Sequence, residues 1–377
     1  MTLATLIDAL ESVAPLALAE PWDNVGLLVG DPMDALGGPV LLTIDLTPGV
    51  VDEAIALRAG AVVAYHPPIF DPIRRLGGPA PRERALLRLV RAGAAIYSPH
   101  TALDAAPGGT ADWLLDASAP GEIVERRALA AHAPARNSFK VIVFVPSAPP
   151  EVVERVRAAM ANAGAGRIGA YEQCSFASPG RGSFLGGPGT NPVVGIRGGG
   201  RLEFVDEHRV EMVCPAGALG GVLRALRGTH PYEEPAFDVV PLAPAPDGRV
   251  GAGRLGVLRA GSTLGAVARR VGASLGVLVS SSGDDDRPVR SIAVCPGSGA
   301  SLLDAAAGAG AEVFVTGEVK HHDALRAADL GLSLVLAGHT ETERGYLPTL
   351  AARLGGLLAG VRFEVSRADR PQLRAVT

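Results

Sequence analysis

The chain has 377 residues, of which 47% are hydrophobic and 20% charged, and its formal net charge is −4. This length and composition indicate a globular protein of two or three domains and exclude a disordered chain. The slightly acidic balance, with arginines spread singly or in pairs, argues against a nucleic-acid-binding surface. The three cysteines, Cys174, Cys214 and Cys295, lie far apart without a CxxC motif, so we expect neither disulfides nor a thiolate zinc site.

The N-terminal segment, MTLATLIDALESVAPL, has acidic residues and helical spacing but no basic region ahead of an apolar stretch. This pattern argues against a secretory signal peptide. No apolar run approaches the ~20 residues that a membrane span needs. We therefore expect a cytoplasmic protein with no membrane segment.

Strand and helix signals alternate in the first third of the chain. Residues 40–46 form an apolar, β-branched run that is typical of a buried strand. Thr47 and Pro48 then supply an N-cap and a proline at the first helical position. This alternation predicts a largely parallel sheet with helices on its faces. The following predicted elements are strands over residues 61–65 and 94–98 and a helix over residues 82–91.

The last third of the chain repeats this alternation, and both thirds place His, Asp or Glu where a predicted strand gives way to a loop. Ligands of open α/β sheets bind outside the carboxyl ends of the strands. We therefore expect the two thirds to share one site. The predicted elements are strands over residues 291–295, 311–316 and 332–336 and helices over residues 301–307, 324–329 and 341–354.

The middle of the chain differs, because strand, helix, strand, strand, helix and strand signals follow one another, which is the ferredoxin-like order. The Pro- and Gly-rich residues 243–253 are typical of a linker. The predicted fold class is α/β, with two halves at residues 1–136 and 246–377 around an inserted α+β domain at residues 137–245. The predicted elements of this domain are strands at 137–146, 183–185, 193–195, 210–213 and 236–242 and helices at 150–163 and 216–227.

Two segments of the first third carry side chains that bind metals. His66 ends a predicted strand and is followed by two prolines, which cannot donate to a sheet ladder and fix the direction of the chain. His100 and Asp104 follow another strand, and their spacing of four puts them on one face of a helical segment. An unliganded strand end and an Asx-capped turn remain the alternatives.

Two segments of the last third of the chain also carry side chains that bind metals. His339 and Glu343 are four residues apart between a strand and a helix, where the helix dipole favours an ionised Glu343. Ordinary first-turn acidic residues are the alternative. His321 and His322 follow another strand and are weaker candidates, of which His322 is the better one to line a site. Imidazole and carboxylate ligands without thiolate suit Zn, Fe, Mn, Ni or Co.

Five segments together resemble the NIF-three-like family, whose members are also called GTP cyclohydrolase 1 type 2 homologues. They cover nearly the whole chain in the family's order. They are PWDNVGLLVGD (21–31), YHPPIF (65–70), SPHTALDAAPGGTADWL (98–114), VTGEVKHH (315–322) and AGHTETE (337–343).

Two segments of the middle stretch, GAGRIGAYEQCSF (164–176) and THPYEEPAFDVVPL (229–242), resemble the subgroup with a CutA- or PII-like inserted domain. Candidate ligand contacts of that domain are His230, Tyr232, Glu233 and Glu234. A turn that joins a helix to a strand is the alternative for these residues.

The resemblance implies a dinuclear metal site in which Glu343 bridges two divalent ions, which a bridging carboxylate holds roughly 3.5–4 Å apart. Many members have a histidine where this chain has Tyr65. The second ion is therefore expected to bind weakly, to recruit His100, or to be ligated by Tyr65 as a phenolate. The implied ligands are His66, Asp104, His339 and Glu343, with Tyr65 as a further candidate.

The family resemblance also implies an assembly and two classes of function. Members are described as hexamers, trimers of dimers, so a second copy of the chain is the expected partner, together with a small-molecule ligand. The first hypothesis is a metal-dependent hydrolase of a nucleotide or related heterocycle, with His100 or His322 moving protons and Asp23 and Asn24 near the substrate. The second is a non-enzymatic metal-handling, chaperone or regulatory protein whose inserted domain senses a ligand.

Overall fold

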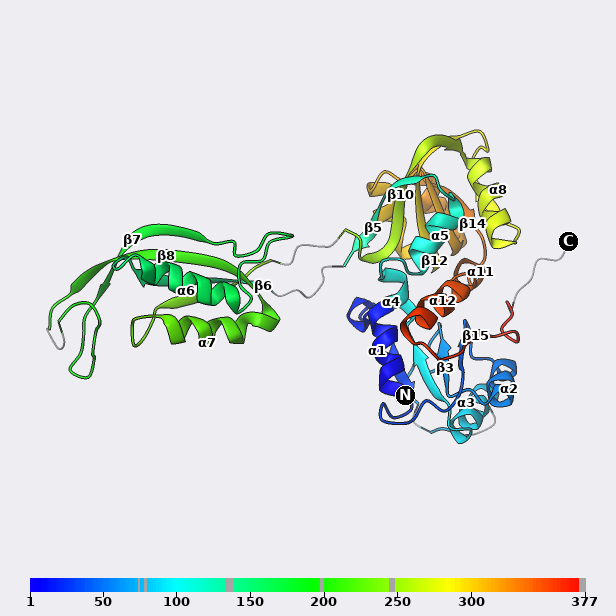
Figure 1. Cartoon of the computed structure of the whole chain (residues 1–377). Coiled ribbons are helices and arrows are strands. Elements are labelled where there is room, and N and C mark those ends of the chain that lie inside the picture. The colour runs from blue at the N-terminus through cyan, green and yellow to red at the C-terminus, as the bar shows by residue number, and fades with distance from the viewer. Residues whose placement is uncertain (74, 78–79, 133–137, 197–199, 244–247, 373–377) are drawn as a thin grey trace. The chain divides into compact units, whose positions relative to one another are not determined.

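The computed structural model describes residues 1–73, 75–77, 80–132, 138–196, 200–243 and 248–372. The chain forms two compact units, one of Met1–Pro134 with Pro246–Thr377 and the other of Ala135–Ala245. The first unit holds a five-stranded and a six-stranded sheet, and the second holds a four-stranded sheet (Figure 1). No helix in the described ranges is long and apolar enough to cross a membrane. The predicted α/β class is confirmed.

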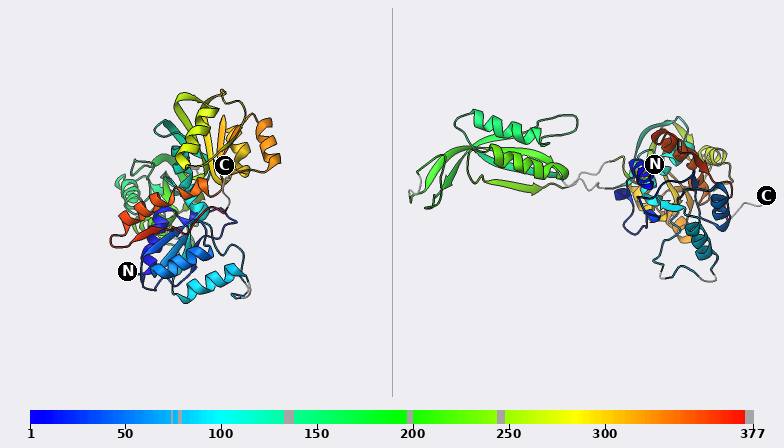
Figure 2. Two further views of the ribbon diagram at one scale, coloured as in Figure 1. Left: turned by 90° about the vertical axis from the view of Figure 1, so that its right-hand side faces the viewer. Right: turned by 60° about the horizontal axis from the view of Figure 1, so that its bottom comes forward.

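The five-stranded sheet has the order β1-β4-β3-β2-β15, in which β1 alone runs antiparallel to its neighbour. Alternate residues of β2 and β3 pack on opposite faces, so the apolar runs predicted from sequence are buried on both sides. Helices α2 and α3 cover one face, and α1, α4 and α12 cover the other (Figure 2). The elements are β1 (Gly26–Val29), β2 (Val40–Thr43), β3 (Ala61–Ala64), β4 (Ala95–Ser98), β15 (Phe363–Val365), α1 (Leu3–Val13), α2 (Pro48–Leu57), α3 (Pro81–Arg91), α4 (His100–Ala105) and α12 (Leu347–Leu357).

The six-stranded sheet has the order β11-β14-β13-β12-β10-β5. Its centre, β12, β13 and β14, is parallel, while β5, β10 and β11 pair antiparallel. Helices α5 and α8 cover one face, and α9 and α10 cover the other. The elements are β5 (Ile123–Ala131), β10 (Gly251–Thr263), β11 (Ser280–Ser282), β12 (Pro288–Ser298), β13 (Val313–Glu318), β14 (Ser333–Leu336), α5 (Thr110–Ser118), α8 (Leu264–Leu275), α9 (Leu303–Gly308) and α10 (His321–Asp329).

The sheet of the second unit has the order β7-β8-β6-β9, and each neighbouring pair is antiparallel. Helices α6 and α7 bury their apolar sides against it, and Val156, Met160, Val222 and Leu226 are inaccessible to solvent. The elements in chain order are β6 (Ser138–Pro146), α6 (Glu151–Asn162), β7 (Phe176–Phe184), β8 (Glu203–Pro215), α7 (Leu219–Thr229) and β9 (Phe237–Pro241).

Three sequence predictions are wrong in detail. The single helix predicted at 341–354 is two helices, α11 (Glu341–Arg344) and α12, because Pro348 in the first turn of α12 lacks the N–H of a continuous helix. The strand predicted at 193–195 is absent, and Gly195 has a φ of +97°. The linker predicted at 243–253 lies partly outside the described residues, and its last three residues begin β10. Short 3-10 helices lie at Leu16–Leu18, Ala216–Ala218 and Ala300–Leu302.

Candidate metal centre

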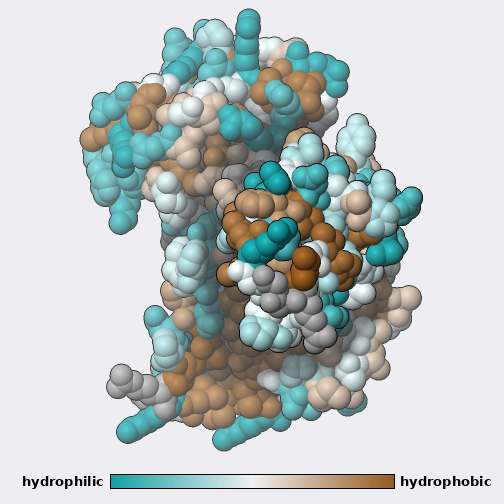
Figure 3. Space-filling model, turned by 90° about the vertical axis from the view of Figure 1, so that its left-hand side faces the viewer, coloured by the Kyte–Doolittle hydropathy of each residue, from teal (hydrophilic) through white to brown (hydrophobic). Residues whose placement is uncertain are grey.

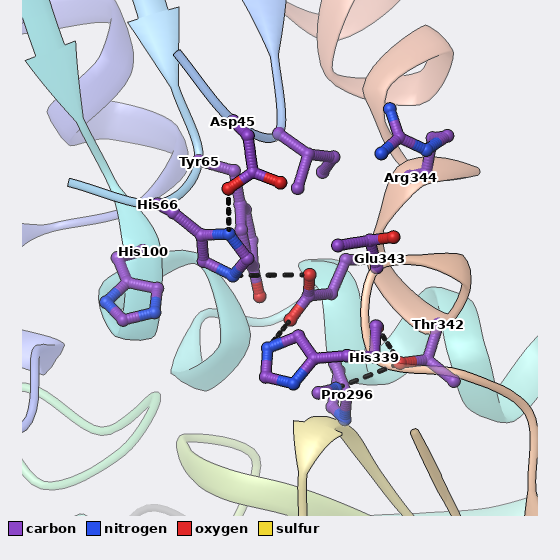
Figure 4. Close-up of polar contacts among 12 residues, drawn as sticks. Asp45, Tyr65, His66, His100, Pro296, His339, Thr342, Glu343 and Arg344 are labelled. Atoms are coloured by element: carbon purple, nitrogen blue, oxygen red, sulfur yellow. Dashed lines mark hydrogen bonds and ion pairs between the residues drawn. The ribbon is translucent and has the colours of Figure 1, made fainter. Parts of the chain in front are cut away.

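His66, His339 and Glu343 lie together within the first unit. Their ligand atoms are all within 4.8 Å of one another. Nε2 of His66 lies 3.3 Å from Oε2 of Glu343, and Nε2 of His339 lies 3.5 Å from Oε1 of the same carboxylate (Figure 4). Side chains from the first and last thirds of the chain therefore face one another at a common point.

The ends of two parallel strands position these ligands. After β3, the backbone N–H of His66 donates to the carbonyl of Ile44, which keeps the residue in register with the neighbouring segment. After β14, the hydroxyl of Thr342 donates to the carbonyl of His339 and accepts from the N–H of Gly297. Gly297 has a φ of +62°, and a Cβ there would lie 2.6 Å from Oε1 of Glu343. A glycine is thus required where the chain passes the carboxylate.

A carboxylate contacts the second ring nitrogen of each ligand histidine. Nδ1 of His66 lies 3.0 Å from Oδ1 of Asp45, and Nδ1 of His339 lies 3.0 Å from Oε1 of Glu318. A carboxylate on Nδ1 selects the tautomer that leaves the Nε2 lone pair free for a metal ion. Asp45 was missed by sequence reasoning, although it shares with His66 a position just after a parallel strand.

Glu343 has the environment of a metal-binding carboxylate. Its side chain is only 3% exposed, and Oε2 accepts no hydrogen bond although it lies near His66. Burial by itself lowers the pKa of His66, but the hydrogen bond with Asp45 and the charge of Glu343 outweigh it and raise this pKa to about 10. A protonated His66 supplies the positive charge that this buried, incompletely bonded carboxylate needs, and a divalent ion that displaces the proton fits the same residues.

The buried Tyr65 and the half-buried Asp104 form a second polar group beside this cluster. The Tyr65 hydroxyl donates to Oδ1 of Asp104 over 2.5 Å. Burial and the charges of Asp104 and Glu343 raise the pKa of Tyr65 well above its ordinary value, while burial raises the pKa of Asp104 to about 7. Tyr65 is therefore a neutral donor to Asp104. Asp104 lies outside the group of three whose ligand atoms are mutually within 4.8 Å.

A buried arginine fixes the end of the helix that carries Asp104. Arg254 on β10 is 1% exposed, and its Nη2 donates to the carbonyls of Ala105 and Ala106 at the end of α4. Its Nε pairs with Asp112 over 3.1 Å, so the buried charge is compensated. The two sheets of the first unit are thereby joined at α4.

Asp23 orients His100. Its side chain is fully buried, with Oδ1 2.8 Å from Nδ1 of His100 and Oδ2 accepting from the N–H and hydroxyl of Thr101. Burial raises the pKa of Asp23, but these hydrogen bonds outweigh it and lower the pKa below its usual value. The His100 ring lies 5.4 Å from that of His66, centroid to centroid. Asn24 instead donates to the carbonyl of Ile69 and so holds the loop that follows His66.

His322 does not join the cluster. It lies in the first turn of α10 with its side chain 74% exposed, and its ionic partner is Asp323 on the same helix, 3.5 Å away. His321 is exposed as well. In the described chain the first turn of α10 directs His322 to solvent, away from the three ligand side chains, so its predicted role at the site stays a prediction.

Two exposed aromatic side chains, one beside His100 and the other beside the first, were not predicted. The Trp22 side chain is 61% exposed and Phe70 is 47% exposed. The Trp22 ring lies 6.2 Å from the ring of Phe70 and 6.2 Å, edge-on, from that of His100. Aromatic rings at this spacing attract each other.

The sequence profile of Duf34/NIF3 (NGG1p interacting factor 3) matches residues 1–371. The chain belongs to the Duf34/NIF3 family. A relative from Mycobacterium leprae named "GTP cyclohydrolase 1 type 2 homolog" is 39% identical over 325 residues, covering 85% of this chain and 81% of the relative. One of the same name from Bacillus subtilis is 36% identical over 373 residues, covering 97% and 96%. A Bacillus cereus crystal structure, described as related to NIF3, matches with a TM-score of 0.75 at 34% identity and covers 98% of both chains.

Proposed function

We propose that this NIF3 family protein binds two divalent metal ions at the site formed by His66, His339 and Glu343. The observation that carries the proposal is the convergence of two Nε2 atoms on a buried carboxylate with an oxygen that lacks a hydrogen bond. The Glu343 carboxylate has two oxygens, so it can bind the ion held by the two histidines and also a second ion on the side of Asp104.

Asp104 is the proposed terminal ligand of the second ion. Its buried carboxyl is electrostatically coupled to Glu343, and its Oδ1 is bonded to the Tyr65 hydroxyl. Tyr65 acts in this proposal as a donor that orients Asp104, with its proton retained. The second ion is therefore held by fewer protein ligands than the first and binds more weakly.

The site is suited to the hydrolysis of a nucleotide or related heterocycle. A bound divalent ion supplies Lewis acidity and lowers the pKa of water toward ~7. His100, held by Asp23 through Nδ1, is positioned to take up or deliver a proton at Nε2. The exposed rings of Trp22 and Phe70 supply an apolar surface for a flat ring. The name of the relatives, "GTP cyclohydrolase 1 type 2 homolog", points to the same class of substrate.

The test is formate release from GTP by protein loaded in turn with Mn, Fe and Zn. We expect turnover in at least one loaded form, and its loss in Glu343→Gln. Glu341→Gln is the matched control, because this carboxylate lies on the same helix outside the cluster. Absence of turnover in all three loaded forms excludes this reaction, whereas metal content measured on the same samples tests binding separately.

A non-enzymatic role in metal handling or regulation is the second candidate. It is favoured by the second unit, which has its own core and its own cavity and contributes no residue to the metal cluster. We infer a ferredoxin-like topology for this unit, supported by its element order and by the sheet order β7-β8-β6-β9. Metal occupancy that follows supply in defined media, without any turnover, would select this role.

We also propose that the chain assembles into a cytoplasmic homo-hexamer. Large apolar side chains in the second unit are exposed, among them Phe176 at 65% and Phe204 at 54%. Such side chains are typical of surfaces that another molecule covers. Sedimentation at equilibrium should give six times the chain mass, and a monomer at micromolar concentration would contradict the proposal.

A further inference from the structure

The second unit contains a cavity of about 490 Å³, far larger than a water molecule and within the size range of small-molecule sites. It lies against the end of β7, the segment that follows it, and the turn before β9. Phe144, Phe184 and Val205 contribute apolar walls. Figure 3 shows hydrophobic and hydrophilic residues side by side on the surface of this unit.

The charged groups of the cavity have one sign. Glu207, Glu233 and Glu234 line it, and no Lys, Arg or His is among the described residues of its wall. Three carboxylates beside apolar walls disfavour an anionic ligand and attract a cation. The negative charge of the cavity lining therefore favours a positively charged ligand.

Glu207 is the least exposed of these three carboxylates. Its Oε1 accepts a hydrogen bond from the Tyr232 hydroxyl over 3.0 Å, which orients the group. Burial and the charge of Glu207 raise the pKa of Tyr232, so the hydroxyl keeps its proton and remains a donor. Oε2 of Glu207 occupies the space where Gly182 has no side chain, because a Cβ there would lie 2.2 Å away.

We propose that this cavity binds a small organic cation, an ammonium group carried on an apolar ring or chain. The ammonium donates to the carboxylate of Glu207, and the apolar part lies against Phe144, Phe184 and Val205. A charge-assisted hydrogen bond to an oriented carboxylate gives specificity, and the apolar contact gives affinity. This site is separate from the proposed metal function and uses none of its residues.

The test is calorimetric titration of the full chain with tryptamine and with indole-3-propionate. These probes share the indole ring and chain length and differ in the sign of the terminal charge. We expect saturable binding of tryptamine and binding of indole-3-propionate that is weaker by roughly tenfold or more, the effect of a lost charge-assisted hydrogen bond. Equal binding of the two probes, or no saturable binding of tryptamine, overturns the proposal.

Variants locate the site. Glu207→Gln keeps an acceptor for Tyr232 but removes the charge, and should weaken tryptamine binding by roughly tenfold. Glu211→Gln is the matched control on the same strand, because Glu211 pairs with Lys140 and does not line the cavity. Gly182→Ala displaces the Glu207 carboxylate without changing any charge, and it should also weaken the binding of tryptamine. Unchanged affinity in both Glu207→Gln and Gly182→Ala overturns the assignment, while metal content in these variants stays at the wild-type level.

Discussion

The candidate metal centre and the cavity of the second unit both present carboxylates, but they hold them in different ways. Glu343 is 3% exposed and lies between two imidazoles, each with a carboxylate on its Nδ1. In the cavity, Glu233 and Glu234 are exposed and Glu207 is half-buried; Glu207 accepts a hydrogen bond from the Tyr232 hydroxyl and Glu233 accepts one from the N–H of Asn191. The carboxylates of the two sites therefore differ in burial and in the groups that contact them.

This difference determines which ligand each site can hold. A buried charge without full hydrogen bonding is costly and is compensated by another charge of opposite sign, so the metal centre suits a multivalent ion. Half-exposed carboxylates beside apolar walls stay hydrated and suit a monovalent organic cation. Substitutions in the metal centre should therefore lower the affinity for a metal ion strongly. The loss should be smaller where the substituted side chain is more exposed.

The largest effect is expected for Glu343→Gln. The variant removes the charge that both histidines face, and the affinity for Zn should fall by at least about a hundredfold, beyond the 10–100-fold typical of groups that only orient a ligand. Competition with a chromogenic chelator measures the affinity. Glu341→Gln on the same helix should bind as the wild type does. If Glu343→Gln bound Zn with wild-type affinity, the proposed difference between the buried carboxylate of the metal centre and the exposed carboxylates of the cavity would be contradicted.

A smaller loss is expected for Asp45→Asn. The amide leaves His66 in place but no longer holds its Nδ1 proton with a charge, so Zn affinity should fall roughly 10–100-fold. Asp52→Asn is the control, since Asp52 pairs with Arg88 on exposed helix surface. An identical affinity in the two variants would show that Asp45 does not orient the ligand.

Glu318→Gln should weaken Zn binding less than Asp45→Asn does, by under about tenfold. The two carboxylates make hydrogen bonds of the same length, but Glu318 is 61% exposed against 32% for Asp45. Water screens the more exposed charge. The same chelator competition applies. If Glu318→Gln lost more Zn affinity than Asp45→Asn, the proposal that the less exposed carboxylate matters more would be contradicted.

The smallest signal is proton release on metal binding. In the metal-free protein the pKa of His66 is raised to about 10, so the ring carries a proton at pH 7.5 that an ion must displace. At least about one proton should therefore be released per Zn bound at the histidine site at pH 7.5, and the share that His66 contributes should fall as the pH rises through 10. Calorimetry in buffers of different ionisation enthalpy measures it. Proton uptake, or no exchange, would contradict the protonation state derived from the structure.

Much of the first unit could be predicted because its strands are buried on both faces. Apolar residues predominate in 40–46, 61–65 and 94–98, and β2, β3 and β4 lie within these ranges with every residue buried. By contrast, β5 has four consecutive exposed residues and carries Glu125, Arg126 and Arg127, so its sequence has no strand signal. Pairing with β10, which is distant in sequence, produces this strand.

The candidate site was predictable where spacing matched strand ends, as for His339 and Glu343. Asp45 and Trp22 were not predictable in this way, because a carboxylate on Nδ1 and an exposed ring beside His100 arise only from tertiary contacts. His322 shows that residue type and sequence position alone do not determine the direction of a side chain. It has the residue type and the position after a strand, but the helix that it begins turns it outward.

Anomalous diffraction from crystals soaked with Zn and measured at its absorption edge tests the central claim most directly. A peak is expected among Nε2 of His66, Nε2 of His339 and the carboxylate of Glu343, with a second, weaker peak on the side of Asp104. Absence of anomalous density at these atoms, or a peak at the exposed His321 and His322 alone, would contradict the proposed metal centre.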